Sequence, residues 1–160
     1  MVLAAIRILL AMIMGMSTSM PAASQNPAAT PTYGEETLVS PLEEPYEIRV
    51  QAGGPIKATQ ELPAPCVGYI ASAPDFDLTY VAGTAPLYIY VESNSDTTLA
   101  IQDPGGVWYC SDDDIGLNPV IEIEAPASGE YFMWVGTYRE NSAERAMLYV
   151  SETPPQPSAN

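Results

Sequence analysis

The chain has 160 residues, with 20 Asp and Glu against 5 Lys and Arg and no histidine. This negative charge disfavours nucleic acid and anionic lipid as partners and favours a basic partner or a divalent cation, unless it is simply a well-solvated acidic surface. The lack of histidine excludes Ser-His-Asp and Cys-His hydrolases, because both need an imidazole to move the proton.

Residues 1–24 have the layout of a secretory signal peptide. Arg7 supplies a positive charge, residues 8–14 are apolar, and small residues at 22–24 predict cleavage before Gln25. The apolar run is shorter than the about 20 residues that cross a bilayer as a helix, and an uncleaved anchor is the alternative. Cleavage leaves 4 basic and 20 acidic side chains, a net charge of 4 minus 20, or −16, and no membrane span. We therefore expect a periplasmic or secreted protein.

Two terminal segments lack a sustained apolar period. Residues 25–45 are rich in Pro, Ala, Thr and Glu, which predicts a flexible linker. Residues 152–160 contain three prolines and are predicted to be a disordered tail. The part between them, residues 46–151, is predicted to be a single domain.

Apolar and polar residues alternate in short runs throughout residues 46–151, as in strands with one buried face. Turn-forming sequences rich in Gly, Pro, Asn, Asp and Ser separate the runs. About eight such strands without a helical period predict an all-β fold, an antiparallel β-sandwich or jelly roll. The predicted inward positions are Tyr46, Ile48, Val50, Phe76, Leu78, Tyr80, Leu87, Ile89, Val91, Leu99, Ile101, Ile121, Ile123, Phe132, Trp134, Ala146, Leu148 and Val150.

The chain has two cysteines, Cys66 and Cys110. In an oxidising compartment such a pair most often forms a disulfide, which for a loop of this length contributes about 4 kcal/mol in the chain-entropy model. The alternative is a pair of metal ligands, but a zinc site cannot be completed without histidine or further cysteines. A Cys66–Cys110 disulfide is therefore predicted.

Two kinds of catalysis do not need histidine. A Ser-Lys dyad would have to use Lys57, the only lysine, which has no Ser-x-x-Lys pattern around it. A pair of carboxylates can hydrolyse a glycoside, but the sequence marks no pair above the rest. No catalytic residue is therefore predicted.

Residues 111–118 form an acidic loop with a glycine, and oxygen ligands around such a turn suit calcium. The spacing is not that of an EF-hand loop. The alternative is that Asp103 and Asp112 close β-turns through their side chains. The candidate calcium ligands are Asp103, Asp112, Asp113, Asp114 and Asn118, joined by Asp75 or Asp77 if the sandwich brings their loops to the same end.

Aromatic residues lie on or beside most of the predicted strands. Exposed tyrosines can make a binding face for a carbohydrate or a peptide, since each gives a broad contact at low entropic cost. In a sandwich such residues are more often core residues or cross-strand pairs. Tyr88 and Tyr90, on the face opposite Leu87, Ile89 and Val91, are the predicted binding face.

The motifs PDFDLTY, LYIYVESNSDTTLAIQDPGGVWYCSDD and APASGEYFMWVGTY resemble the bacterial pre-peptidase C-terminal domain. The resemblance covers about residues 46–151 and extends to small exported proteins that share GYIASAPD and SDDD with GLNP. These are often called serine peptidases, which conflicts with the lack of histidine here.

The resemblance implies a β-sandwich that normally accompanies a secreted enzyme and aids secretion, localisation or substrate binding. Some members of the family bind calcium or insoluble substrates. Asp103, Asp112, Asp113 and Asn118 match the acidic turn region of the family, and no catalytic residue carries over. Because no catalytic domain is present here, the resemblance implies a free-standing module.

Three functional hypotheses follow from the sequence. The first is a non-enzymatic exported binding or accessory module, with calcium as its one candidate cofactor and an unknown protein or polysaccharide as its partner. The second is a structural or assembly subunit of an envelope complex that makes contact through residues 25–45 and an exposed sheet edge. The third is a hydrolase that uses carboxylates.

Overall fold

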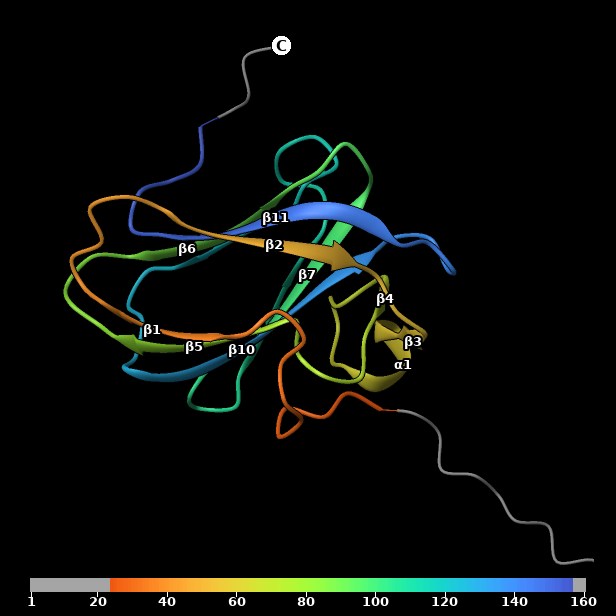
Figure 1. Cartoon of the computed structure of the whole chain (residues 1–160), viewed down its shortest axis with the longest axis horizontal. Helices are drawn as coiled ribbons and strands as arrows, with labels where there is room; N and C mark the ends of the chain where they lie inside the picture. The colour runs from red at the N-terminus through yellow and green to blue at the C-terminus, as the bar shows by residue number, and fades with distance from the viewer. Residues whose placement is uncertain (1–23, 157–160) are drawn as a thin grey trace, which may run out of the picture.

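The alternating runs form eleven strands arranged in two packed sheets (Figure 1). The computed structural model describes residues 24–156. One sheet is antiparallel and has the order β2-β11-β6-β9. Its strands are β2 (Tyr46–Ala52), β11 (Glu144–Ser151), β6 (Leu87–Glu92) and β9 (Val120–Ile123).

The second sheet has seven strands and is built around β10 (Gly129–Thr137). β5 and β4 pair with one edge of β10, and β7 pairs with the other edge and continues the sheet to β8. The remaining strands extend this sheet beyond β5 and β4. Its other strands are β1 (Glu35–Val39), β3 (Ile56–Lys57), β4 (Tyr69–Ile70), β5 (Phe76–Val81), β7 (Thr97–Gln102) and β8 (Trp108–Ser111).

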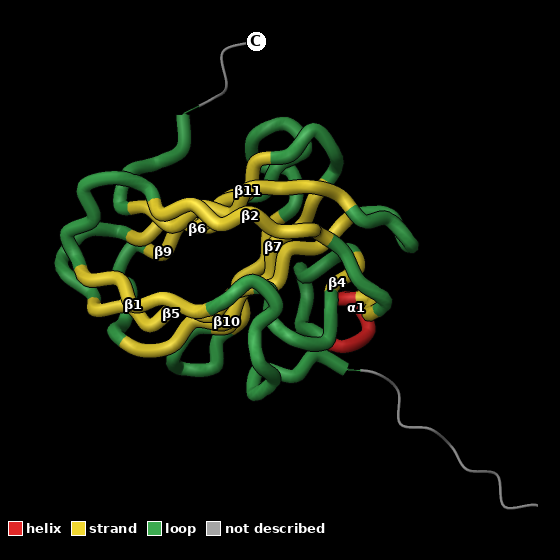
Figure 2. Tube along the Cα trace, in the orientation of Figure 1, coloured by secondary structure: helices red, strands yellow, loops and turns green. Residues whose placement is uncertain are grey.

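The main core lies between the two sheets, which Figure 2 shows as two layers of strands. Alternate residues of each strand face inward, as the period of two requires. Leu148 of β11, Ile89 of β6, Leu78 of β5 and Met133 of β10 are all fully buried there. The predicted all-β sandwich is confirmed.

A second apolar cluster covers part of the outer face of the seven-stranded sheet. Residues 56–70 include β3, the short helix α1 (Ala58–Glu61) and β4, and they pack on Trp134 of β10. Cys66 in this segment is bonded to Cys110 of β8, with 5.0 Å between their Cα atoms. The predicted disulfide is confirmed, and it fastens the covering segment to the sheet.

The structure differs from the expectations in four respects. On β10 the predicted inward residues Phe132 and Trp134 belong to the outer cluster, because it is the alternate residues Tyr131, Met133 and Val135 that face the main core. Residues 35–39, inside the predicted linker, form strand β1, which pairs in parallel with β5. The side chains of β1 are mostly exposed, so its sequence lacks a clear alternation of apolar and polar residues. For that reason the sequence did not predict this strand. The chain has more than the expected number of strands because β3 and β4 have two residues each, and α1 is a helix where none was predicted.

Other expectations fall partly or wholly outside the described residues. The predicted signal peptide lies outside them except for Ser24. Of the predicted tail, Glu152 accepts hydrogen bonds from the Tyr80 hydroxyl at 2.6 Å and from the Leu42 amide at 3.0 Å, so the chain is held at this point. Within residues 24–156, no helix has the length and apolar character needed to cross a membrane.

Replacing Cys66 and Cys110 together by alanine should lower the free energy of unfolding by about 4 kcal/mol, because the unfolded chain regains the entropy of a long loop. Trp134 is fully buried under the segment that Cys66 anchors, so its fluorescence should also shift to the red if that segment loosens. Urea unfolding followed by tryptophan emission measures both effects. An unchanged unfolding midpoint would show that the disulfide does not stabilise the fold.

Candidate functional site

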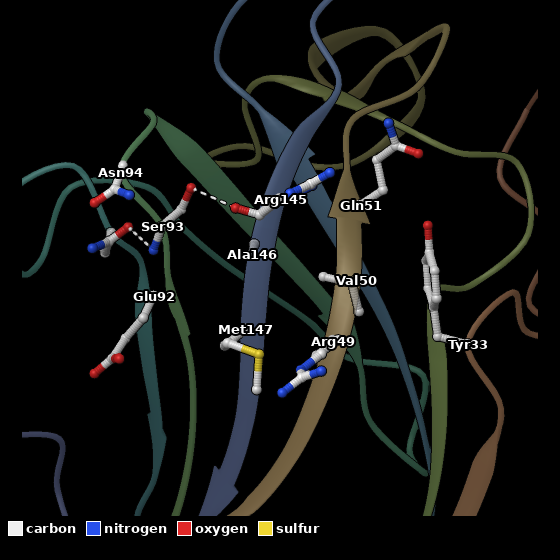
Figure 3. A pocket seen from close by; sticks show the side chains of 11 residues that line it. Tyr33, Arg49, Val50, Gln51, Glu92, Ser93, Asn94, Arg145, Ala146 and Met147 are labelled. Carbon is white, nitrogen blue, oxygen red and sulfur yellow. Dashed lines mark hydrogen bonds between the residues drawn. The ribbon is translucent and has the colours of Figure 1, made fainter.

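A groove of about 850 Å³ crosses the edge of the four-stranded sheet, along β2 and across the ends of β11 and β6 (Figure 3). β2 is an edge strand, and Val50 and Gln51 form part of the wall. Met147 contributes an apolar surface from β11. The remaining lining residues are Tyr33, Arg49, Glu92, Ser93, Asn94, Asn118, Arg145 and Ala146.

Two basic side chains from neighbouring strands line this groove. In the β2–β11 register, Arg49 is opposite Met147 and Arg145 is opposite Gln51, so the two arginines are diagonal neighbours on the same face. Both are exposed. Neither guanidinium takes part in the hydrogen bonds drawn among the lining residues in Figure 3, which join Ser93 to Asn118 and to the carbonyl of Arg145.

The predicted tyrosine face lies on the same sheet. Tyr88 donates a hydrogen bond to Glu122 at 2.8 Å and is partly exposed. Tyr90 is only 7% exposed, because its ring stacks on Tyr149 of β11 with 4.8 Å between the ring centres and an angle of 10° between the planes. Tyr90 therefore forms a cross-strand pair, and Tyr88 and Tyr149 carry the accessible aromatic surface.

A second cavity, of about 450 Å³, adjoins the groove and shares Tyr33 and Gln51 with it. Asp75, immediately before β5, lines this cavity and is 2% exposed. Its carboxylate accepts a hydrogen bond from the Val135 amide at 2.7 Å. Burial raises the pKa of Asp75 to about 7, and the Val135 hydrogen bond opposes that rise.

Three carboxylates meet on the outer face of the seven-stranded sheet. Glu35 of β1 is opposite Asp77 of β5, and Glu130 of β10 lines the same depression of about 340 Å³. Burial, and then the negative charges of Glu35 and Glu130, raise the pKa of Asp77 to about 6.

The predicted calcium ligands do not form one group. Asp103 closes the β7–β8 turn by accepting hydrogen bonds from the amides of Gly105 and Val107, both at 2.8 Å. Asp112 follows β8, at the opposite end of the β7–β8 hairpin. The alternative, in which Asp103 closes a β-turn through its side chain, is confirmed. Because Asp103 lies at the other end of the hairpin from Asp112, it is not part of the acidic loop.

The acidic loop itself is held by internal hydrogen bonds. Asp114 accepts from the Ser111 hydroxyl and from the Val120 amide, and Asp112 accepts from the Asp113 amide. Asp112, Asp113 and Asp114 line a shallow depression of about 300 Å³. Among residues 24–156, no three acidic or cysteine side chains are arranged to hold a metal ion.

Two further predicted ligands lie apart from this loop. The Asn118 side-chain oxygen accepts a hydrogen bond from the Ser93 amide at 3.1 Å and lines the groove. Asp75 faces the second cavity, and Asp77 faces the outer side of the seven-stranded sheet.

Comparison with family models and with curated proteins finds no match. Among solved structures, the chain is similar to the crystal structure of Aeromonas hydrophila PliG, a periplasmic lysozyme inhibitor of g-type lysozyme. That match has a TM-score of 0.41 and 16% sequence identity, and it covers 74% of this chain and 96% of that chain. The resemblance to the pre-peptidase C-terminal domain stays a prediction.

Sequence reasoning did not find the groove or its two arginines. One signal was available: only four basic residues follow the predicted signal peptide, and Arg49 and Arg145 both stand at outward positions of strands. The pairing of β2 with β11, which joins positions almost a hundred residues apart, is what brings them together.

The raised pKa of Asp75 predicts a pH dependence of stability. The folded state holds this proton up to about pH 7, whereas the unfolded carboxyl has its ordinary pKa of 3.8. The contribution of Asp75 to stability should therefore be greatest at low pH and decrease towards pH 7, by up to about 1.4 kcal/mol per pH unit.

Urea unfolding between pH 4 and 8 measures the free energy of unfolding of the wild type and of Asp75→Asn. The difference between the two should decrease as the pH rises. Asp77→Asn is the matched control. The difference in free energy of unfolding between the wild type and this variant should stop changing near pH 6, because the pKa of Asp77 is raised to about 6. A constant difference for Asp75→Asn would contradict the prediction.

Calcium binding by Asp112, Asp113 and Asp114 predicts that the mature chain melts several degrees higher in calcium than in chelator, because the ion would bind the folded state preferentially. The Asp112→Asn and Asp113→Asn double variant should abolish that difference. Calorimetry of both proteins measures it. Coincident melts of the wild type would reject calcium and leave these residues with their turn hydrogen bonds alone.

Proposed function

We propose that the mature chain is an exported, non-enzymatic binding module whose groove takes a segment of a protein partner. The observation that carries this proposal is the pair of neighbouring arginines, Arg49 and Arg145, in a groove on a chain of net charge −16 after cleavage. Half of the mature chain's basic side chains therefore lie in one groove. A functional explanation is needed for that concentration.

The chemistry of the groove suits a peptide. Arginine binds carboxylates through two parallel hydrogen bonds, so the pair would recognise acidic side chains or a chain terminus. Met147 lies beside them and is a flexible apolar contact for varied side chains. β2 is an edge strand, and an edge strand offers backbone groups to which an extended segment can add.

The described residues lack the arrangement that an enzyme of a familiar hydrolase class would need. The chain has no histidine, and Lys57, the only lysine, lies on β3 in the covering segment. The carboxylates of Glu35, Asp77 and Glu130 lie in an open depression on a sheet face. A binding role therefore accounts for more of the structure than carboxylate hydrolysis does.

A second candidate is an assembly subunit that makes contact through β1. β1 is an edge strand, and Val39 of β1 is opposite Val81 of β5. These two side chains are 56% and 44% exposed, and they form an apolar pair at the sheet edge. Such an edge suits pairing with a further chain.

Photo-crosslinking in cells that express the full chain separates these proposals. A photoreactive residue at Met147 should capture one defined protein, whereas the same residue at Thr79, on the outer face of the other sheet, should not. Reversing both groove charges with Arg49→Glu and Arg145→Glu should reduce that capture at least about tenfold, the equivalent of about 1.4 kcal/mol.

The matched control is Lys57→Glu with Arg139→Glu, which makes the same change in net charge outside the groove lining. Equal losses in both double variants would show that only net charge matters. Capture from Val39 in place of Met147 would replace the groove proposal by the assembly role.

A further inference from the structure

The second cavity is lined by four segments of the chain that meet beside the groove. They are residues 32–33, the end of β2 with the turn that follows it, the segment before β5, and the loop between β10 and β11. Tyr33 and Gln51 line both this cavity and the groove, so the two lie next to each other.

Glycines in the β2 turn make this arrangement possible. A side chain at Gly53, whose φ is +110°, would collide with the carbonyl oxygen of Ser142, and one at Gly54 would collide with the backbone of Ile70. The Gly53 amide also donates to the Val135 carbonyl at 2.9 Å. The two glycines therefore allow the turn after β2 to pack directly against neighbouring backbone.

Among residues 24–156, Asp75 is the only charged side chain that lines the cavity, and Tyr33 is the only other titratable one. In the same part of the chain, the Val135 amide is the one hydrogen-bond donor to the Asp75 carboxylate. A buried carboxylate with a single neutral donor is costly when ionised, and a cation placed against it recovers much of that cost. The site therefore has the chemistry to hold a positively charged group.

We propose that this cavity binds the ammonium or guanidinium group of a lysine or arginine side chain presented by the protein partner that occupies the groove. The partner segment would then carry an acidic group towards Arg49 and Arg145 and a basic side chain towards Asp75. This inference rests on the proposed function for the identity of the ligand. The chemistry of the cavity can be tested without the partner.

The charge of the chain supports a basic ligand at this position. A net charge of −16 attracts cationic groups and raises their local concentration at the surface. The same charge disfavours a partner that is acidic throughout. A segment with both signs of charge satisfies the groove and the cavity together.

The test is titration of the ¹⁵N-labelled mature protein with butylammonium and with methylguanidinium at pH 8, where Asp75 is ionised, followed by NMR. The Val135 amide, which donates to Asp75, is the reporter. The chemical shift of this amide should change to a saturating value with each cation, with dissociation constants in the millimolar range. It should not change with 1-butanol.

Asp75→Asn keeps an acceptor for the Val135 amide but removes the charge, so it should weaken cation binding at least about tenfold. Asp77→Asn, two residues along the chain and outside the cavity lining, should bind as the wild type does. The wild type at pH 5 provides a measurement that needs no variant, since protonation of Asp75 should also weaken binding.

Absence of a saturable shift in the wild type at pH 8 would overturn the inference, as would equal binding by Asp75→Asn. A shift produced by calcium chloride and not by butylammonium would make the cavity a metal site and would also overturn it. Cation binding at Asp75 without any crosslink from Met147 would support the cavity chemistry while the groove proposal failed, so the two failures are distinguishable.

Discussion

The structure depends on the burial of β10 from both sides. Met133 and Val135 face the main core between the sheets, while Trp134 faces the covering segment on the other side. The same strand pairs with β5, β4 and β7 through its backbone. A strand buried on both faces cannot shift its register without exposing one of these sets of side chains, so β10 fixes the positions of the neighbouring strands.

The position of β10 also determines the site. The Val135 amide holds the Asp75 carboxylate, and the Val135 carbonyl accepts from Gly53 at the end of β2. Val135 thus connects two of the segments that line the second cavity, the one before β5 and the turn after β2. The groove continues from that point along β2, so the candidate binding surface adjoins a strand that is buried on both faces.

The surface has a consistent electrostatic arrangement. The two groove arginines stand on an acidic molecule, and the buried carboxylate of Asp75 belongs to the adjoining cavity. Neighbouring sites of opposite sign favour a partner with a matching order of charges and disfavour one that carries a single sign. The acidic loop at residues 111–118 lies apart from this surface, and its side chains are used largely by its own turns.

The sequence by itself determined the all-β class, the disulfide and the inward positions of most strands, although on β10 the predicted Phe132 and Trp134 face away from the main core. The reason is that these depend on local alternation and on the chemistry of two cysteines. Tyr88 and Tyr90 were placed correctly on an outer face because the period of two is a local property. The covering of Tyr90 by Tyr149 was not predictable, since β6 and β11 meet only through sheet pairing.

Only the tertiary structure decided the groove, the second cavity and the separation of Asp103 from Asp112. Arg49 and Arg145 become neighbours through the β2–β11 register, and Asp75 becomes buried because β10 crosses it. Strand β1 was missed for the same reason, since its pairing with β5, not its own weak pattern, makes it a strand. Local sequence carries the periodicity of each strand, whereas the contacts between distant strands arise only when the whole core is assembled.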